Sequence, residues 1–467
     1  MNRIEILAYL AKDAEILCDV GCDHAYSLIL AIKKYGVKSG IAADVATGPL
    51  NNAKTSIFAN NLSDKIEIVL SDGFKNISNN FDTAIISGMG GNLICDILTN
   101  SFAKIKDKTL ILEANCDVPI VRKFLNQNNF KIIAEEALYD QGKYYEIIKA
   151  IPGNENLDEF DLKYGPILRI KRNDDFLKYY KRKIQMYKDI LGKITNEVRK
   201  ENIRREFYES LCVINGTMIE KRYINNTLNH YTSYYIDNEK HDTIVVCPGG
   251  GYAYTSPRES EPVALEFNKL GYNVVVVNYL ETKEAYPMPG TYVKIAIEEI
   301  AKDDRVGKII GMGFSAGGHC ILELLLHKKD YNLNVEIKHL ILGYPVVTAN
   351  PLYAHNGSFE NLLQNKDSHE LRQYLSLETQ VQENEDLEVF LWGTYTDQSV
   401  PVMNSLLLIK EYLKCQGTIE YHMFPYGGHG LSVCNEYSSE GNKEKESPYI
   451  ARWIDFADNW LKLKLNK

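Results

Sequence analysis

The chain has 467 residues, of which 45% are hydrophobic and 25% charged, and its formal net charge is −9. This composition is that of a globular protein and excludes general disorder, while the length predicts two or three domains. No apolar run reaches the roughly 18 to 20 residues of a membrane span, and charged side chains near the start leave no apolar core for a signal peptide. The nine scattered cysteines indicate buried, reduced thiols in a cytoplasmic protein.

Charge is distributed unevenly along the chain. Residues 1–215 carry 30 basic and 29 acidic side chains, whereas the remaining residues carry 23 basic and 33 acidic ones. Within the first part, residues 163–205 hold 14 basic and 5 acidic side chains. An acidic total taken alone argues against a nucleic-acid partner, but this asymmetry predicts separate modules with separate partners.

Residues 1–153 alternate short β-rich runs with stretches of helical length, which is typical of a parallel sheet with crossover helices. The strands are predicted at residues 15–20, 40–43, 66–70, 83–86, 108–113 and 145–150. Pro152 and Gly153 then interrupt the pattern. We therefore predict a first α/β domain over residues 1–153.

Residues 154–215 form a second segment, which is predicted to be mostly helical. Between residues 173 and 210 there is no proline and a single glycine, Gly192, and apolar or aromatic side chains recur at helical spacing from Phe176 to Ile194. The opposite face of these helices is basic. That face is either a solvated helix exterior or a surface for an acidic partner.

A second α/β run occupies residues 216–467. Its strands are predicted at residues 243–247, 273–278, 308–313, 339–342, 388–392 and 418–424. Residues 438–447 are polar and charged, and they are predicted to form a loop rather than a further domain.

Glycines and acidic residues follow four successive strands of the first domain. Gly21 ends the first strand immediately before an apolar helix, where a ligand can approach the backbone. Asp44 follows the second strand, 25 residues after Asp19, at the position where doubly wound folds bind ribose hydroxyls. Residues 71–73 (Ser-Asp-Gly) and 87–91 (Ser-Gly-Met-Gly-Gly) follow the third and fourth strands. Because ligands of open α/β sheets bind at the carboxyl ends of the strands, we predict one ligand site there.

Several interpretations of this site compete. A nicotinamide cofactor requires G-x-G-x-x-G, and this loop has one glycine. S-adenosylmethionine (AdoMet) has no pyrophosphate, so one glycine suffices, and its ribose still needs an acid such as Asp44. Turn glycines and capping aspartates explain each motif separately, but not their joint placement. Cys18, Cys22 and His24 have no obvious fourth ligand for zinc, so we predict no metal.

These motifs resemble those of the TrmK family, the bacterial tRNA (adenine-22-N1)-methyltransferases. The resemblance covers about residues 1–200 and is carried by Cys-Asp-Val-Gly-Cys-Asp-His-Ala-Tyr (18–26), Asp44 with Gly48-Pro49-Leu50, Ser-Asp-Gly (71–73), Gly-Met-Gly-Gly-Asn (88–92) and Tyr-Asp-Gln-Gly-Lys-Tyr-Tyr-Glu (139–146). It implies a Rossmann-like class I methyltransferase, with tRNA bound on a helical extension.

The resemblance also implies the site residues. AdoMet would be bound by Asp19, Gly21, His24, Asp44, Asp72, Gly73, Gly88, Met89 and Gly90, the target base by Asn92 or Asn115, and tRNA by Lys171, Arg172, Lys181, Arg182 and Lys183. One departure is Glu113-Ala114-Asn115, where the family's Gln-Pro-Asn is expected. Asn115 is kept, but the strand end beside the expected base pocket is altered.

The end of the fourth strand bears on which atom is methylated. Methyl transfer requires a nucleophile held in line with the sulfonium at near-attack distance. Adenine N1 is weakly basic, so positioning suffices without a strong general base. Ser-Gly-Met-Gly-Gly differs from the Asn-Pro-Pro-Tyr type associated with exocyclic amines, which favours N1 over N6. A base paired in the tRNA would have to be flipped out, at a cost of about a few kcal/mol.

The second α/β domain contains a predicted nucleophile elbow. Residues 313–317 (Gly-Phe-Ser-Ala-Gly) match G-x-S-x-G between a predicted strand and a predicted helix. Upstream, Pro-Gly-Gly-Gly-Tyr (248–252) follows a strand where an α/β-hydrolase has its oxyanion loop. The backbone N–H groups of Gly250 and Gly251 would join that of Ala316 in stabilising a tetrahedral oxyanion.

The order of a catalytic triad in this fold is serine, acid, histidine. Asp397 follows one predicted strand and His429 follows the last one, so we predict Ser315 as nucleophile, Asp397 as orienter of the imidazole and His429 as general base. The rivals are Glu378 or Asp386 for the acid and His422 for the base, while His319 is interpreted as a packing residue at the helix start.

Residues 225–463 resemble small α/β-hydrolase esterases of the acetylxylan-esterase-related (BD-FAE-like) group. The resemblance is carried by Pro-Gly-Gly-Gly-Tyr, Arg258-Glu259-x-Glu261-Pro-Val-Ala, Gly-Phe-Ser-Ala-Gly-Gly-His, Asp397 with Val400-Pro401, and Gly-Gly-His-Gly. It implies hydrolysis of a small acyl ester by residues 216–467.

We therefore predict a fusion of an AdoMet-dependent tRNA methyltransferase (1–153), its helical tRNA-binding extension (154–215) and a serine esterase (216–467), with no metal or membrane partner. Two alternatives remain open. The N-terminal half binds tRNA or AdoMet without catalysis, or the C-terminal half is a non-catalytic relic of a hydrolase.

Overall fold

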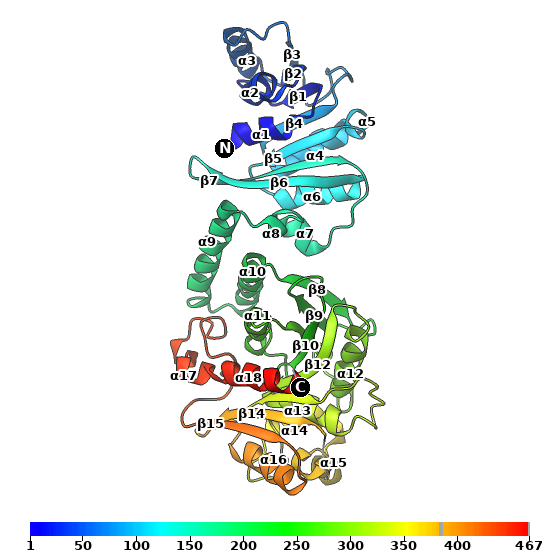
Figure 1. The fold of residues 1–467 in the computed structure, drawn as a ribbon, viewed down its shortest axis with the longest axis vertical. Helices are drawn as coiled ribbons and strands as arrows, with labels where there is room; N and C mark the ends of the chain where they lie inside the picture. The colour runs from blue at the N-terminus through cyan, green and yellow to red at the C-terminus, as the bar shows by residue number, and fades with distance from the viewer. Residues whose placement is uncertain (383–385, 466–467) are drawn as a thin grey trace. The chain divides into compact units, whose positions relative to one another are not determined.

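The computed structural model describes residues 1–382 and 386–465, and these divide into two compact units, residues 1–183 and 184–467 (Figure 1). The division falls within the long helix α9 (Asp174–Leu191). The predicted helical segment 154–215 is therefore shared between the units.

Unit 1 is built on a seven-stranded sheet with the strand order β3-β2-β1-β4-β5-β7-β6. Its strands are β1 (Ile16–Val20), β2 (Ser39–Asp44), β3 (Ile66–Leu70), β4 (Thr83–Met89), β5 (Thr109–Ala114), β6 (Phe130–Asp140) and β7 (Lys143–Pro152). β1 to β5 are parallel, whereas β7 runs antiparallel to β5 and β6 to β7. The predicted α/β class is confirmed, and β6 was not predicted.

Helices cover both faces of this sheet. One face packs against α1 (Arg3–Leu10), α2 (Tyr26–Tyr35) and α3 (Thr47–Ala59), and the other against α4 (Gly91–Asn100), α5 (Phe102–Ile105) and α6 (Val118–Gln127). Successive strand residues point to opposite faces, so Leu17 belongs to the first core and Cys18 to the second. This explains why the parallel strands are apolar throughout rather than alternating.

A buried ion-pair cluster holds the segment that follows β7 against the unit 1 sheet. Arg122 on α6 donates to Glu135 on β6 (2.7 Å) and to Glu146 on β7 (2.6 Å), and its side chain is fully buried. Glu135 also accepts the backbone N–H groups of Ile167 and Leu168. The helices α7 (Glu159–Tyr164) and α8 (Leu168–Lys171) are thereby held against the β6–β7 hairpin.

Unit 2 contains an eight-stranded sheet with the order β15-β14-β13-β12-β10-β11-β9-β8. Its strands are β8 (Met218–Tyr223), β9 (His230–Tyr235), β10 (His241–Cys247), β11 (Asn273–Asn278), β12 (Val306–Phe314), β13 (His339–Gly343), β14 (Glu388–Thr394) and β15 (Ile419–Phe424). β10 to β15 are parallel, and β8 and β9 extend the sheet antiparallel.

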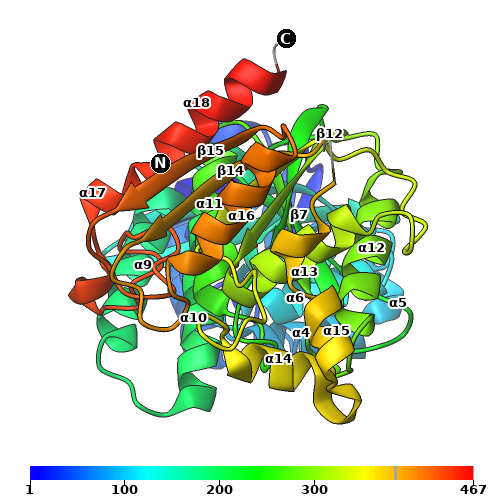
Figure 2. The same cartoon turned by 90° about the horizontal axis from the view of Figure 1, so that it is seen from below.

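This second sheet is also covered on both faces. The helices α12 (Met288–Ile300), α13 (Ser315–Leu326) and α16 (Met403–Lys414) share one core, while α11 (Glu261–Lys269) and α18 (Trp453–Leu465) pack on the other face. There Trp392 stacks on Trp453 at 4.8 Å. Figure 2 shows α16 and α18 on opposite sides of β14 and β15. Other helices of this unit are α14 (Asn356–Leu363), α15 (His369–Tyr374) and α17 (Pro448–Ala451), with the short helices η1 (Pro257–Glu259), η2 (Gln364–Lys366), η3 (Leu377–Gln380) and η4 (Lys443–Lys445).

Helix α10 (Glu197–Asn215) packs within unit 2. Arg204 and Lys200 form ion pairs with Glu440, at 2.8 and 3.3 Å. Tyr208 donates a hydrogen bond to the carbonyl oxygen of Tyr437 (2.7 Å). The loop predicted at residues 438–447 therefore contacts a helix that precedes the unit 2 sheet.

Candidate functional site

The turns after β1 and β4 meet at the carboxyl edge of the unit 1 sheet. Gly21 has φ +80°, and a Cβ placed on it would lie 2.3 Å from the terminal carbon of Met89. The backbone N–H groups of Gly21 and Cys22 both donate to the carbonyl oxygen of Ala43. β1 and β4 are the neighbouring strands at which the strand order reverses, which is where open α/β sheets bind ligands.

Three predicted cofactor residues lie at this edge, Asp44 as the last residue of β2 and the other two on loops. Asp44 accepts the backbone N–H of Ala46 (3.0 Å) through Oδ1. Asp72 is exposed and pairs with Lys75 at 2.5 Å. The imidazole of His24 stacks flat on the ring of Tyr26, with centroids 5.0 Å apart.

Asp19, by contrast, lies inside the unit. It is 2% exposed, and Ser27 on α2 donates to its Oδ2 at 2.6 Å. Burial raises the pKa of Asp19 to about 6, an effect that the Ser27 hydrogen bond opposes. This carboxyl group therefore ties β1 to the first turn of α2.

The end of β4 and the turn after it hold the other predicted contacts. Gly88 has φ +78°, and no atom lies within 4 Å of the place of its missing Cβ. Gly90 is the N-cap of α4, and Asn92 lies exposed in the first turn of that helix. Asn115 donates its backbone N–H to the carbonyl oxygen of Met89 (2.8 Å), so both candidates for contacting the base adjoin this turn. Gly73, after β3, has φ +57°.

Glu113, the departure from the family pattern, braces the same turn. Its fully buried carboxylate accepts the N–H of Gly88 and a hydrogen bond from Arg3, both at 2.9 Å through Oε2. Burial raises the pKa of Glu113, and the positive charge of Arg3 opposes this. Arg3 was not predicted, since no motif surrounds it.

Apolar side chains are exposed beside the polar ones at this edge. Tyr26, Val45, Leu70 and Leu93 lie in or directly after α2, β2, β3 and the start of α4, and each is at least half exposed. Exposed apolar residues next to carboxylates and a glycine turn suit a ligand with both apolar and hydroxyl-bearing parts.

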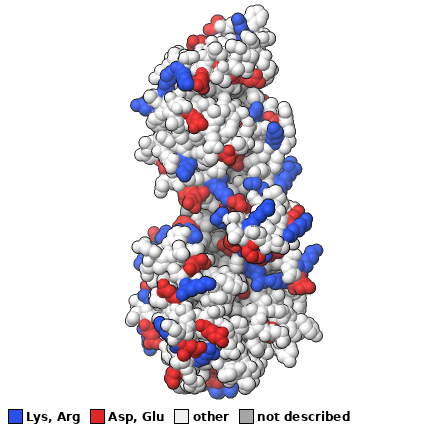
Figure 3. Space-filling view, turned by 180° about the vertical axis from the view of Figure 1, so that it is seen from behind, with Lys and Arg blue, Asp and Glu red and all other residues white. Residues whose placement is uncertain are grey.

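The basic residues predicted to bind tRNA lie near the β6–β7 hairpin. Arg182 lies over the ring of Tyr139 at 5.2 Å, and Lys183 over that of Tyr179 at 5.1 Å. Lys171 is paired with Glu136, Arg172 ends α8 with φ +44°, and Lys181 is exposed on α9. On the face drawn in Figure 3, basic and acidic side chains are interspersed.

Ser315, His429 and Asp397 come together at the carboxyl edge of the unit 2 sheet. Ser315 Oγ lies 2.8 Å from His429 Nε2, and His429 Nδ1 lies 2.7 Å from Asp397 Oδ2. Asp397 is 5% exposed, and its Oδ1 accepts the N–H groups of Ser399 (2.9 Å) and Val400 (3.0 Å). This arrangement suits a nucleophile, a general base and a carboxylate that orients the base.

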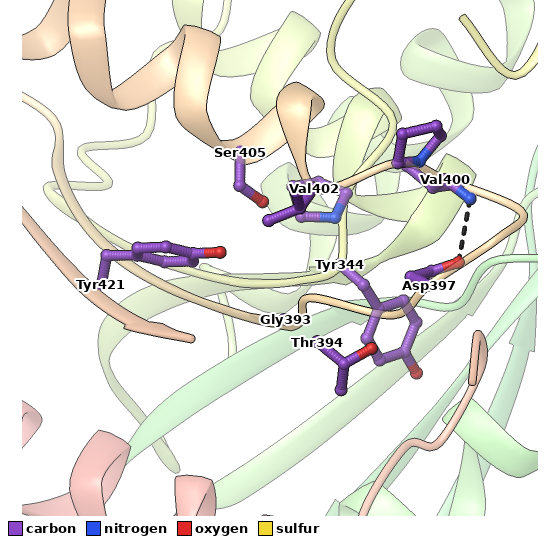
Figure 4. Close-up of a pocket in the computed structure, with 10 residues that line it drawn as sticks. Tyr344, Gly393, Thr394, Asp397, Val400, Val402, Ser405 and Tyr421 are labelled. Atoms are coloured by element: carbon purple, nitrogen blue, oxygen red, sulfur yellow. Dashed lines mark hydrogen bonds between the residues drawn. The ribbon is translucent and has the colours of Figure 1, made fainter. Parts of the chain in front are cut away.

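A small cavity lies behind the acid (Figure 4). Its lining residues include Tyr344, Gly393, Thr394, Asp397, Val400, Val402, Ser405 and Tyr421. At about 10 Å³ the cavity is too small for an ester substrate. The residues around Asp397 in Figure 4 therefore hold its carboxylate in place and do not form a substrate pocket.

The backbone around Ser315 has the geometry of a nucleophile elbow. Ser315 has φ +51°, and a Cβ on Gly317 would lie 2.1 Å from the carbonyl oxygen of Cys247. Gly250 and Gly251 have φ +122° and +60°. The N–H of Gly249 is bonded to Glu259, which leaves the next two N–H groups of the loop as the candidate oxyanion donors.

The rival triad residues have other partners. Glu378 accepts from Thr348, Asp386 pairs with Lys328, and His422 pairs with Glu420. His319 is 1% exposed and is hydrogen-bonded to Tyr252 and to the carbonyl oxygen of Leu375.

Among the described residues, no group of three or more His, Cys, Asp or Glu side chains has a geometry that could hold a metal ion. All nine cysteines are free thiols, and no helix in residues 1–382 or 386–465 is long and apolar enough to cross a bilayer.

Comparison with known proteins bears on both units. Residues 17–216 match the model of the TrmK family, described as tRNA (adenine(22)-N(1))-methyltransferase. The tRNA (adenine(22)-N(1))-methyltransferase of Bacillus subtilis (strain 168) is 29% identical over 216 residues, 44% of this chain and 91% of that protein. The resemblance predicted from the motifs is confirmed.

The C-terminal part is similar to hydrolases. Endo-1,4-beta-xylanase B of Butyrivibrio fibrisolvens is 28% identical over 330 residues, which is 67% of this chain. The chain spans about half of that relative, 48% of its length. A solved structure of the acetyl ester-xyloside bifunctional hydrolase from Caldicellulosiruptor lactoaceticus is 32% identical, covers 51% of this chain and 89% of that one, and has a TM-score of 0.45.

The TrmK match ends one residue beyond α10, the helix that packs in unit 2. The stretch that matches the family model and the compact unit 1 therefore end at different places.

Proposed function

We propose that the N-terminal part is an AdoMet-dependent methyltransferase that modifies N1 of the adenine at position 22 of tRNA. The TrmK match over residues 17–216 carries this proposal. The carboxyl edge of unit 1 supports it, because an acid ends β2 and positive-φ glycines lie directly after β1 and at the end of β4. The basic residues of α8 and α9 supply phosphate contacts.

The residues at this edge fit AdoMet. Asp44 is placed to accept the ribose hydroxyls, and at Gly88, where no atom lies within 4 Å of the missing Cβ, a ligand can come close to the backbone. Bound AdoMet supplies an electrophilic methyl group on a positively charged sulfur. The protein's part is to orient the base: the backbone at Asn115 is tied to the Met89 turn, and Glu113 holds the Gly88 N–H beside it.

Methyl transfer to tRNA tests this proposal. Tritium from labelled AdoMet is expected in unmodified tRNA and not in the same tRNA with guanine at position 22. Asp44→Ala should raise the KM for AdoMet about 10- to 100-fold, since it removes a hydrogen-bonded charged partner. Asp64→Ala, an exposed aspartate before β3, is the control and should behave as wild type. Binding of AdoMet and tRNA without incorporation would instead support a binding-only module.

We propose that the C-terminal part is a serine esterase for a small acyl ester. The Ser315–His429–Asp397 geometry carries this proposal. Ser315 Oγ attacks the ester carbonyl carbon while His429 Nε2 takes its proton, and Asp397 stabilises the imidazolium. The N–H groups of Gly250, Gly251 and Ala316 stabilise the oxyanion. His429 then protonates the leaving alcohol, and water cleaves the acyl-enzyme by the reverse sequence of proton transfers.

Turnover of p-nitrophenyl acetate tests the esterase. Ser315→Ala is expected to lower kcat by about 10⁴- to 10⁶-fold, because the attacking atom is lost. Ser210→Ala removes a buried hydroxyl on α10 that bonds to the carbonyl oxygen of Glu206, and it should retain wild-type turnover. Equal turnover by wild type and Ser315→Ala would remove the proposed triad, and no turnover by either would favour a relic. The free thiols support the further proposal that the protein is cytoplasmic.

A further inference from the structure

A buried carboxylate lies between the oxyanion loop and the loop that carries His429. Glu259, at the end of η1, is 3% exposed. Its Oε2 accepts the backbone N–H of Gly249 at 2.9 Å, and its Oε1 accepts the hydroxyl of Tyr344 at 2.7 Å. No step of the proposed ester hydrolysis uses this group directly.

Tyr344 connects Glu259 to the loop that carries His429. Its Oη accepts the backbone N–H of Ser432, three residues after His429, at 2.9 Å. Its ring lies edge-on to the imidazole of His429, with centroids 5.0 Å apart. The hydroxyl of Ser432 donates directly to the carbonyl oxygen of Arg258 at 2.5 Å. Residues 258–259 are therefore bonded to both loops.

The chemistry of this position favours a carboxylate. Both of its partners, the Gly249 N–H and the Tyr344 O–H, are donors, and an ionised carboxylate is an acceptor at both oxygens. An amide at residue 259 would turn a donor toward one of them. In a buried site, the unpaired donor would cost more than the hydrogen bond itself contributes.

The packing leaves little room for independent movement. A Cβ on Gly249 would lie 2.8 Å from the Cβ of Ser315 and 2.9 Å from Glu259 Oε2. The backbone at Gly249 is thus held between the nucleophile and the carboxylate. A displacement of Glu259 shifts the N–H groups of Gly250 and Gly251, which follow directly in the chain.

We infer that Glu259 is a positioning residue that holds the oxyanion loop and the His429 loop at a fixed separation. This inference rests on the esterase function proposed above. Glu259 touches neither substrate nor the reacting atoms, and it acts through Gly249 on one side and through Tyr344 on the other.

The test compares Glu259→Gln with Glu323→Gln in the full chain. Glu323 is also 3% exposed and accepts hydroxyls, from Tyr286 and Tyr331, but it contacts neither loop. Loss of a direct oxyanion donor costs about 10²- to 10³-fold in kcat, and Glu259 acts one contact away, so we expect kcat for p-nitrophenyl acetate to fall about 10- to 100-fold. KM should change little, whereas affinity for a trifluoromethyl ketone, which mimics the tetrahedral oxyanion, should fall in proportion to kcat. Glu323→Gln should alter neither.

Tyr344→Phe keeps the inference testable if Glu259→Gln does not fold. It breaks the link to Ser432 but leaves Gly249 bonded, so it should lower kcat and shift the acidic limb of the kcat/KM pH profile. The inference would be overturned if a folded Glu259→Gln kept the wild-type kcat and ketone affinity. It would also be overturned if Tyr344→Phe kept the wild-type kcat/KM pH profile. Failure of the esterase proposal itself would give a different result, because the wild type would then show no turnover that depends on Ser315.

Discussion

Asp19 shows how one buried group makes the stability of unit 1 depend on pH. Its pKa is raised from an ordinary 3.8 to about 6, chiefly by burial and further by the charge of Asp44. Because the folded pKa is the higher one, the folded state holds the proton more tightly than the unfolded state does. The stabilisation is complete below about pH 4 and is lost as pH rises through about 6.

Asp19→Asn should remove this dependence. The amide can still accept from Ser27 and never ionises, so the variant should be more stable than wild type at pH 7.5, with the difference vanishing near pH 4. The pKa difference corresponds to about 3 kcal/mol. Hydrogen exchange of the β1 amides measures this local stability, and Asp72→Asn, at an exposed carboxyl group, is the control. A gain in stability that is the same at both pH values would contradict the assignment.

At the scale of elements, the strand-to-helix turn of β12 and α13 has no room for a side chain at Gly317. The nearest atoms to a Cβ there are the carbonyl oxygens of Cys247 and Pro248, at 2.1 and 2.3 Å. These are backbone atoms of the neighbouring strand end, so they cannot rotate away as a side chain could. The close approach is needed because α13 begins directly beneath the oxyanion loop.

Gly317→Ala is therefore expected to abolish esterase turnover and to destabilise unit 2 by more than about 3 kcal/mol, as overpacking against the backbone does. Gly428→Ala is a matched control, since Gly428 is beside His429 and nothing lies within 4 Å of its missing Cβ. Turnover and thermal unfolding report both effects. Wild-type turnover in Gly317→Ala would show that the elbow tolerates a displacement of this size.

At the scale of the whole molecule, the position of α10 decides where the chain can be divided. The helix buries Phe207, Tyr208, Leu211, Cys212 and Val213, and its ion pairs with Glu440 lie within unit 2. Cutting after residue 216, where the TrmK match ends, removes all of these contacts from the rest of unit 2. Cutting at the boundary between the units keeps them.

We expect the fragment 184–467 to retain esterase turnover and to unfold close to the temperature at which unit 2 unfolds in the full chain. The fragment 217–467 should melt at least about 10 °C lower, because several buried side chains at about 1.5–3 kcal/mol each are lost from its surface. Calorimetry of the two fragments compares them directly. Equal melting temperatures would mean that α10 contributes nothing to unit 2.

The charge of the chain also has to be considered unit by unit. Residues 1–183 carry 24 basic and 24 acidic side chains, so unit 2 holds the whole net charge of −9. The basic run 163–205 is divided, and Lys188, Lys200 and Arg204 are paired with acidic residues of unit 2. The basic residues that remain beside the β6–β7 hairpin belong to unit 1.

The sequence by itself determined the two α/β folds, the ends of most strands, the resemblance of residues 17–216 to the TrmK family and the residues of the candidate triad. Each of these depends on residues close together in the chain. The elbow needs glycines two residues either side of Ser315, and a parallel strand needs an apolar run followed by a polar turn. Such local demands leave a readable pattern.

Only the tertiary structure decided that Glu259 joins the Gly249 loop to the His429 loop through Tyr344, that Arg3 braces Glu113, that Arg122 is buried between two glutamates, and that α10 packs in unit 2. These contacts connect residues that are tens to hundreds of positions apart. A charged residue looks the same in the sequence whether it is solvated or buried against a partner. Packing settles which, because a buried charge is stable only where the fold supplies its partners.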